Sequence, residues 1–179
     1  MDKKHFTIGC CGIDCGLCPR FYTEGSSKCP GCGGPGFREA HPSCAVLNCC
    51  YNKHKLEICS LCKDFPCGRY NVKEKIEKDS FITHKRIFYN FDFVKNHGLA
   101  KFIKEQKIRM QLLNILLEKY NDNRSKNYYC LATALLSTDN INNILQFIKN
   151  NEKTTVETLK NKINEYAEKE KIELKLIKH

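Results

Sequence analysis

Three pairs of cysteines with a two-residue spacer stand out in this chain of 179 residues: Cys15/Cys18, Cys29/Cys32 and Cys59/Cys62. A C-x2-C spacing lets two sulfur atoms approach one ion from a tight turn, so each pair can supply half of a tetrahedral thiolate site. Gly33 follows Cys32 directly, and glycine tolerates the positive φ that such turns often need. The stretch "CPGCG" (29–33) is therefore typical of a zinc knuckle.

Cysteine is unusually abundant, because the chain has 13 and 12 of them lie in the first 67 residues. An odd total, closely spaced pairs and an N-terminus without the apolar segment of a signal peptide argue against a disulfide scaffold. These features favour metal ligation by reduced thiols. We therefore expect a cytoplasmic protein.

The spacing between the pairs suggests how ligands would be shared. Cys15/Cys18 together with Cys29/Cys32 gives C-x2-C-x10-C-x2-C, which is close to zinc-ribbon spacing. Cys59/Cys62 would then need partners from the remaining nearby cysteines, which are Cys44, Cys49, Cys50 and Cys67. His41 and His54 are spare candidates, although a single histidine in a polar loop is usually only solvated.

Cys11, Cys15 and Cys18 carry a second signal, the spacing C-x3-C-x2-C. Radical S-adenosylmethionine enzymes hold a four-iron cluster with this spacing, but the chain after Cys18 shows no succession of β-α units, so we reject that enzyme class. A 4Fe-4S cluster with a distant fourth cysteine stays open as the alternative to zinc. Both kinds of site use cysteines only, and "CPGCG" favours zinc. A thiol redox pair is a third interpretation, against which Cys15/Cys18 lack an identifiable preceding strand.

Four cysteine motifs occur in an order that resembles a bacterial and archaeal family, the domain of unknown function 3795. The motifs are "CCGIDCGLCPRF", "KCPGCGG", "CAVLNC" and "ICSLCKDFPC", and the resemblance runs from about residue 9 to residue 70. The later stretches "HGLAKFIKEQKIRM" and "YNDNRSKNYYCLATALL" look like the C-terminal extension of one subgroup. The family is presumed to bind metal, and the resemblance implies no activity.

The resemblance implies ten pattern cysteines as metal ligands: Cys11, Cys15, Cys18, Cys29, Cys32, Cys44, Cys49, Cys59, Cys62 and Cys67. Two zinc ions in structural sites of four cysteines each would use eight of them, and we choose Cys11 and Cys67 as the surplus because the others pair regularly. A cluster or a bridging thiolate would use the ten differently. Cys10 and Cys50 fall outside the pattern and are expected to be bystanders.

Two features after residue 70 could carry chemistry of another kind. Cys130 lies alone in an apolar run, where a cysteine is most often a small core residue. The stretch "YNDNRSKNYY" predicts a turn with a helix cap. Its alternative is a contact to a small anionic ligand through Arg124 and Lys126, which would make the chain an enzyme on such a ligand.

The formal net charge of +10 is compatible with a nucleic-acid partner, but bound metal sites would lower this charge. Each divalent ion held by four thiolates carries a net charge of about −2. The remaining lysines alternate with glutamates along the second half of the chain, as on a solvated helix face. Nucleic acid is thus weakly supported, a membrane is not expected, and the partner is an unknown protein or small molecule.

The elements that must position the cysteines are sparse. Residues 1–70 contain only 13 Val, Ile, Leu, Met or Phe side chains, too thin a core for a segment of this length. The stretch "CPGCGGPG" (29–36) is nearly all turn residues. Metal binding would supply the missing folding free energy, on the order of 10 kcal/mol per zinc ion.

Residues 71–179 have a helical period instead. It is clearest over 97–122, and helices are also predicted over 81–96, after Thr138 or Asp139, and from a capping box at Thr154 and Glu157. The run 126–136 could be a buried strand or a helix, and the alternation of Ile172, Leu174 and Leu176 predicts a terminal strand. A small β-α-α-β arrangement behind one long helix would follow.

The sequence therefore predicts an α+β fold with a loop-rich, metal-stapled cysteine module at 1–70 and a mainly helical α+β part at 71–179. We expect a metal-binding protein with a binding or regulatory role. An iron–sulfur protein in electron transfer or redox sensing, and an enzyme acting on a small anion, are the alternatives.

Overall fold

The computed structural model describes residues 2–41, 43–68, 70 and 78–177, and this part of the chain contains helices and no β-strand. The predicted α+β class and the β-α-α-β arrangement are therefore wrong. The run 126–136 is helical up to Leu135, and residues 172–177 form no regular structure. A strand needs a ladder of backbone hydrogen bonds. The backbone of Ile177 instead accepts one such bond, from Asp79 at 3.2 Å.

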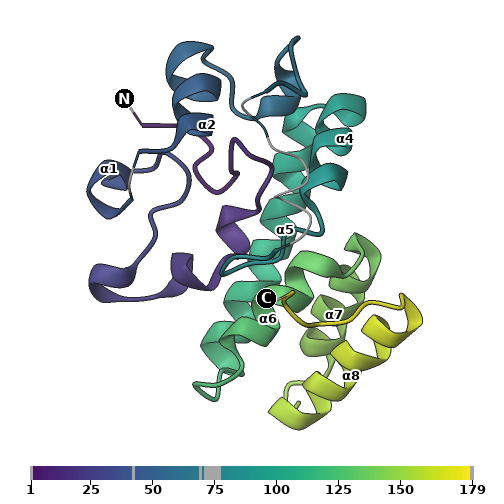
Figure 1. The fold of residues 1–179 in the computed structure, drawn as a ribbon. Helices are drawn as coiled ribbons and strands as arrows, with labels where there is room; N and C mark the ends of the chain where they lie inside the picture. Colours follow the sequence, from purple (N-terminus) through teal and green to yellow (C-terminus); the bar gives the residue numbers. More distant parts are fainter. Residues whose placement is uncertain (1, 42, 69, 71–77, 178–179) are drawn as a thin grey trace. The chain divides into compact units, whose positions relative to one another are not determined.

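Regular structure is short before residue 70 and long after it (Figure 1). The first part contains η1 (Cys15–Leu17), η2 (Pro19–Tyr22), η3 (Gly25–Ser27), α1 (Phe37–Ala40), α2 (Ala45–Leu47), η4 (Asn48–Lys53) and η5 (Cys59–Leu61). The second contains α4 (Ile87–His97), α5 (Leu99–Lys119), α6 (Lys126–Leu135), α7 (Thr138–Asn150) and α8 (Val156–Lys169).

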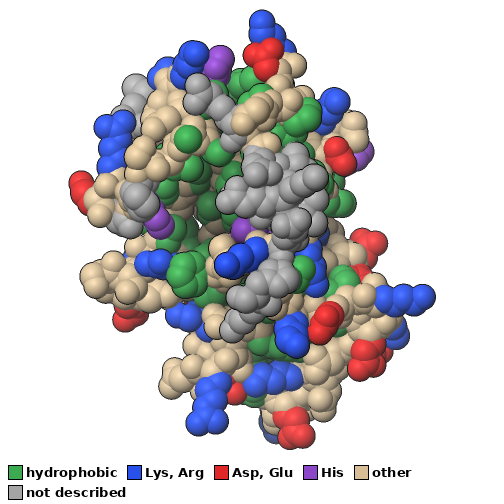
Figure 2. All heavy atoms as spheres, viewed as in Figure 1, with side chains coloured by type: hydrophobic (Ala, Val, Ile, Leu, Met, Phe, Trp, Pro, Cys, Tyr) green, Lys and Arg blue, Asp and Glu red, His purple; other side chains and the backbone are tan. Residues whose placement is uncertain are grey.

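The described chain divides into two compact units, residues 1–103 with 176–179 and residues 104–175. The first unit contains all the cysteines except Cys130, together with α4 and the start of α5. No helix in the described residues is both long enough and apolar enough to cross a membrane. On the face shown in Figure 2, Lys and Arg side chains are spread among Asp and Glu side chains rather than gathered in one patch.

Helix α4 supplies much of the core that the cysteine-rich segment lacks. Ile87, Phe91 and Val94 are buried in one cluster with Ile8 and Ile58. The predicted helix over 81–96 is shorter in the structure, because it begins at Ile87. Phe81, predicted as core, is 61% exposed, and the guanidinium of Arg20 lies 4.8 Å from its ring.

A buried asparagine ties α4 to the first cysteine loop. The Asn90 side-chain amide donates to the backbone oxygen of Gly12 at 2.9 Å and to the Asp14 carboxylate at 2.8 Å. Gly12 has φ +84°, and a Cβ atom there would lie 2.9 Å from the Phe91 ring. The loop can therefore approach α4 this closely only with glycine at position 12.

The second unit is held by a buried arginine. Arg109 on α5 is 2% exposed, and its guanidinium donates to the backbone oxygens of Thr133 and Leu136 at 2.8 and 2.7 Å. These acceptors lie at the end of α6, where carbonyl groups have no partner within the helix. Glu105 pairs with the same guanidinium at 3.0 Å.

Two helix starts in this unit differ by one residue from the predicted ones. Ser137, not Thr138 or Asp139, caps α7 by accepting from the Asn140 backbone N–H. Thr155, not Thr154, caps α8 by accepting from the Thr158 N–H. Several neighbouring residues at each helix start can act as an N-cap. The sequence therefore predicts where the helix begins only to within about one or two residues.

Candidate metal centre

Two of the C-x2-C pairs are built as the same turn. In both Cys15/Cys18 and Cys59/Cys62 the N–H of the second cysteine donates to the backbone oxygen of the first, at 3.1 and 2.9 Å. The second cysteines have nearly identical dihedral angles, φ −80° and ψ 135° at Cys18 and φ −80° and ψ 134° at Cys62. The repeated pattern C-x-L-C-x-x-F ("CGLCPRF", "CSLCKDF") accompanies this turn.

The third pair, Cys29/Cys32, has a different geometry that depends on glycine. The Cys32 N–H donates to the Phe6 backbone oxygen at 2.7 Å rather than back to Cys29. Gly31 has φ +83°, and a Cβ atom there would lie 2.3 Å from the Phe6 oxygen. Gly33 has φ +68°, so the predicted positive φ after Cys32 is confirmed.

Cys15 and Cys18 lie close to the pair Cys29/Cys32, the partners that the spacing predicts. The Cys29 N–H donates to the backbone oxygen of Arg20, two residues after Cys18, at 2.8 Å. The Gly16 and Cys32 N–H groups donate to the adjacent backbone oxygens of Thr7 and Phe6. His41 joins this group, because its Nε2 atom lies 3.1 Å from the Cys29 sulfur. We call Cys15, Cys18, Cys29 and His41 the outer group.

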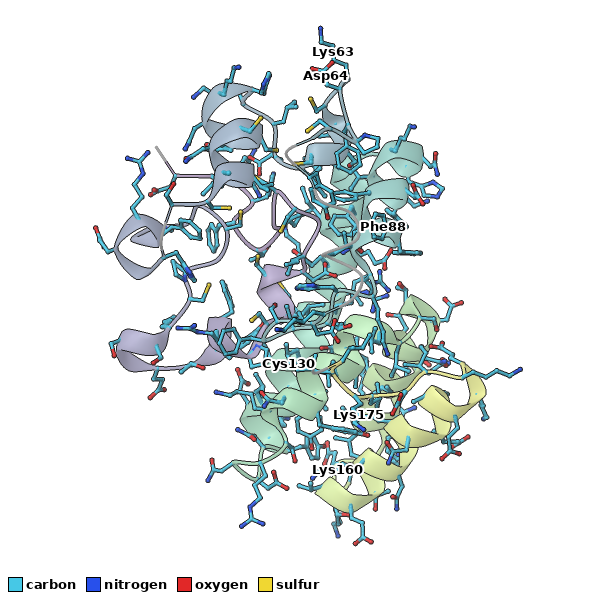
Figure 3. All side chains as sticks on the ribbon, in the orientation of Figure 1. Lys63, Asp64, Phe88, Cys130, Lys160 and Lys175 are labelled. Atoms are coloured by element: carbon cyan, nitrogen blue, oxygen red, sulfur yellow. The ribbon has the colours of Figure 1, made fainter. Side chains whose placement is uncertain are left out.

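A second group of thiols is more deeply buried. Cys10 and Cys50 belong to one buried cluster against which Cys32 and Cys59 pack, and the Cys10 N–H donates to the Cys32 sulfur at 3.4 Å. Cys10 and Cys50 are 1% and 4% exposed. We call these four cysteines, Cys10, Cys32, Cys50 and Cys59, the inner series. Figure 3 shows sulfur atoms among the loops of the first unit.

The surroundings of these thiols favour their neutral form. Hydrogen bonding to Cys10, followed by burial, raises the pKa of Cys32, and burial is the main cause of the raised pKa values of Cys15 and Cys18. At Cys10 the bond with Cys32 acts to lower the pKa, but the bond with Cys50 and burial outweigh it, so the pKa is raised. A metal ion would have to displace these protons.

Lys3 brings a buried positive charge to the same place. Its side chain is fully buried, and its ammonium group donates to the backbone oxygens of His5 and Ile8 and pairs with the Glu57 carboxylate at 3.3 Å. The ammonium also acts electrostatically to lower the pKa of Cys10, Cys15, Cys32 and Cys50. A buried lysine is rare unless it is paired.

The remaining predicted ligands are less tightly grouped. Cys11 lies near Cys15, and both Cys11 and Cys59 contribute to the raised pKa of Tyr70, after burial. The Cys44 sulfur accepts the Leu47 N–H at 3.5 Å, and Cys44 and His41 border a hollow of about 510 Å³. Cys49, Cys62 and Cys67 are partly exposed free thiols.

The donor types suit a soft divalent ion or an iron–sulfur cluster, since they are thiols and an imidazole. Their positions do not form a closed coordination shell. In the ranges that the structure describes, no group of three or more His, Cys, Asp or Glu side chains is placed to hold a metal ion. The structure therefore brings the thiols near one another in pairs without converging them on one point.

The sequence patterns predict that Cys10 and Cys50 are bystanders and that His41 is a spare candidate, yet all three lie in the two thiol groups. The signal for the cysteines was the two "CC" doublets, at 10–11 and 49–50. For His41 the signal was Phe37 four residues earlier, because the two rings stack at 4.7 Å across α1. The other spare histidine, His54, is exposed.

The turn around Arg124 has the geometry of a helix cap. The Asp122 carboxylate accepts from the Ser125 hydroxyl at 2.6 Å and the Arg124 N–H at 3.1 Å, and pairs with Lys160 at 3.0 Å. These bonds lower the pKa of Asp122, with the Ser125 bond as the largest cause. Cys130 is buried on α6 (Figure 3), as expected for a core cysteine.

Comparisons with protein-family models, with curated proteins and with solved structures find no significant match to this chain. The resemblance to the domain of unknown function 3795 therefore stays a prediction.

Proposed function

We propose that the chain is a zinc-binding protein in which the metal stabilises the cysteine-rich part of the first unit. The observation that carries this proposal is the backbone bonding that brings the Cys15–Cys18 turn next to Cys29 and Cys32, with the His41 Nε2 atom 3.1 Å from the Cys29 sulfur. Free thiols from separate turns gathered in this way are the donor set of a structural zinc site. The role of the protein is then binding or regulation through the surface that the metal holds in shape.

The short helices before residue 70 need an additional source of stability, which a bound metal ion would provide. Described elements before residue 70 are at most six residues long, in η4, and helices this short are not stable by themselves. A zinc ion contributes on the order of 10 kcal/mol when it binds a site that the unfolded chain lacks. That amount is comparable to the whole stability of an ordinary domain, so one or two ions would decide whether this part folds.

Metal analysis of anaerobically purified protein tests the proposal. Mass spectrometry should find between one and two zinc ions per chain, and the Cys130→Ser variant should bind the same number. Less than one metal ion per chain would contradict metal binding. A brown protein with iron and visible charge-transfer absorption would replace zinc by the 4Fe-4S alternative.

A further inference from the structure

The inner series contains two cysteines that no motif assigns. Cys10 and Cys50 belong to one buried cluster, and Cys32 and Cys59 pack against that cluster. The four residues come from different turns of the chain, and Cys50 belongs to the irregular helix η4. A buried cysteine is usually a small core residue, but four cysteines packed in one cluster also match, in number and in type, the ligands of one metal ion.

We propose that Cys10, Cys32, Cys50 and Cys59 are the ligands of one tetrathiolate metal site. This inference rests on the proposed metal-binding function and goes further, because it takes Cys10 and Cys50 as ligands although the family pattern omits both. Binding of a zinc ion would release the four thiol protons and leave a site with a net charge of about −2.

Backbone hydrogen bonds already hold parts of the series in place. The Cys10 N–H donates to the Cys32 sulfur at 3.4 Å, and the Cys59 N–H donates to the Cys10 backbone oxygen at 2.9 Å. An N–H group aimed at a sulfur atom stabilises a thiolate ligand once it forms. Closing the series around an ion needs side-chain rotation between the staggered χ1 positions that each cysteine can adopt.

Lys3 supplies charge that such a site needs. A net negative site in a buried place is costly unless positive charge lies nearby. The Lys3 N–H donates to the backbone oxygen of Gly33, the residue after Cys32, at 2.8 Å, and the buried Lys3 ammonium pairs with Glu57 at 3.3 Å. A purely apolar role for the four thiols gives no reason to place a lysine beside them.

The assignment also decides to which of the two proposed metal sites Cys32 belongs. The zinc-ribbon spacing pairs Cys32 with Cys15 and Cys18, whereas its sulfur contacts Cys10. With Cys32 in the inner site, His41 takes its place in the outer group. That group then has three sulfur donors and one imidazole, another common structural zinc set.

Counting the zinc ions in matched variants tests the assignment. The double variant Cys10→Ser/Cys50→Ser should bind one zinc ion fewer than the wild-type chain, whereas Cys130→Ser should bind the full number. With Co²⁺ in place of zinc, the double variant should also lose the absorption of the tetrathiolate site. Unchanged zinc and Co²⁺ spectra in the double variant would overturn the assignment and leave the proposed function intact. A wild-type chain that binds no metal would overturn both.

A second measurement does not depend on the variants folding. The wild-type protein is treated with N-ethylmaleimide in the zinc-loaded and in the chelated state, and the modified cysteines are identified by mass spectrometry. We expect zinc to slow modification of Cys10 and Cys50 at least as strongly as that of Cys32 and Cys59, with Cys130 as the internal reference. Equal reactivity of Cys10 and Cys50 in the two states would contradict the assignment.

Discussion

Lys3 is the residue whose environment departs most from what its type suggests. Near the start of a chain a lysine is expected to be solvated, and nothing in "MDKKHF" distinguishes Lys3 from Lys4. In the structure Lys3 is fully buried against backbone oxygens and Glu57, while Lys4 is exposed. The sequence could not predict this, because the burial depends on loops that meet only in the folded chain.

Replacing Lys3 by Met should therefore weaken both folding and metal retention. The change leaves the Glu57 carboxylate and several carbonyl oxygens without their partner, a loss on the order of 3 kcal/mol in the free energy of unfolding. Zinc should also be lost to a chromophoric chelator at a lower chelator concentration than from the wild-type chain. Lys4→Met is the matched control, and equal behaviour of the two variants would contradict the role of Lys3.

Arg109 shows the same effect in the second unit. Its position in the helical stripe of "KFIKEQKIRMQLL" predicts no special role, yet its guanidinium satisfies the end of α6. Arg109→Met should lower the free energy of unfolding by about 3 kcal/mol, because buried carbonyls and Glu105 lose a charged partner. Chemical denaturation measures the loss. Lys107→Met, an exposed change on the same helix, should alter stability by less than about 0.5 kcal/mol.

At the scale of elements, the sequence predicted the helices better than the strand. The backbone hydrogen bonds of a helix are local, so a 3.6-residue apolar period is enough to predict one. Helices α5, α7 and α8 lie where this pattern predicts them. Alternation such as that of Ile172, Leu174 and Leu176 needs a neighbouring strand, and the described chain provides none. The cysteine turns were predictable because C-x2-C is a local pattern, whereas the inner series joins residues up to 49 positions apart.

The contact between α4 and the first cysteine loop is a second element that local patterns do not reveal. Asn90→Ala would leave the Gly12 oxygen and the Asp14 carboxylate without this donor, although Asp14 keeps other interactions. We expect a loss of about 2 kcal/mol in the free energy of unfolding, measured by denaturation of the zinc-loaded protein. Asn96→Ala, an exposed change on the same helix, serves as control. A similar effect of both changes would contradict a special role for Asn90.

For the whole molecule, the change in composition near residue 70 marks the end of the cysteine motifs. The first compact unit nevertheless continues to residue 103, since Phe91 and Phe102 share its core. A change in composition therefore does not mark the boundary of a compact unit, because that boundary depends on which side chains contact one another. The helical stretch after residue 78 thus contributes to both units.

Removal of the metal should therefore affect the two units differently. Hydrogen exchange after treatment with a chelator should speed up through residues 10–62, where the proposed ligands lie. The amides of α7 and α8 should keep their protection, because both helices belong to the second unit and none of the proposed ligands does. Added zinc should restore the slow exchange. Equal loss of protection in α7 and α8 would show that the metal stabilises the whole chain instead.

The bond between Asn90 and Gly12, 78 positions apart, also sets an order of events during synthesis. Twelve thiols have been made by residue 67, but the helix that packs on their loop is complete only at His97. At about 5 to 20 residues per second, the ribosome needs about 1.5 to 6 s for the intervening residues. During that interval the nascent thiols are open to oxidation and to the wrong metal ion, so a reducing environment matters most before α4 has emerged.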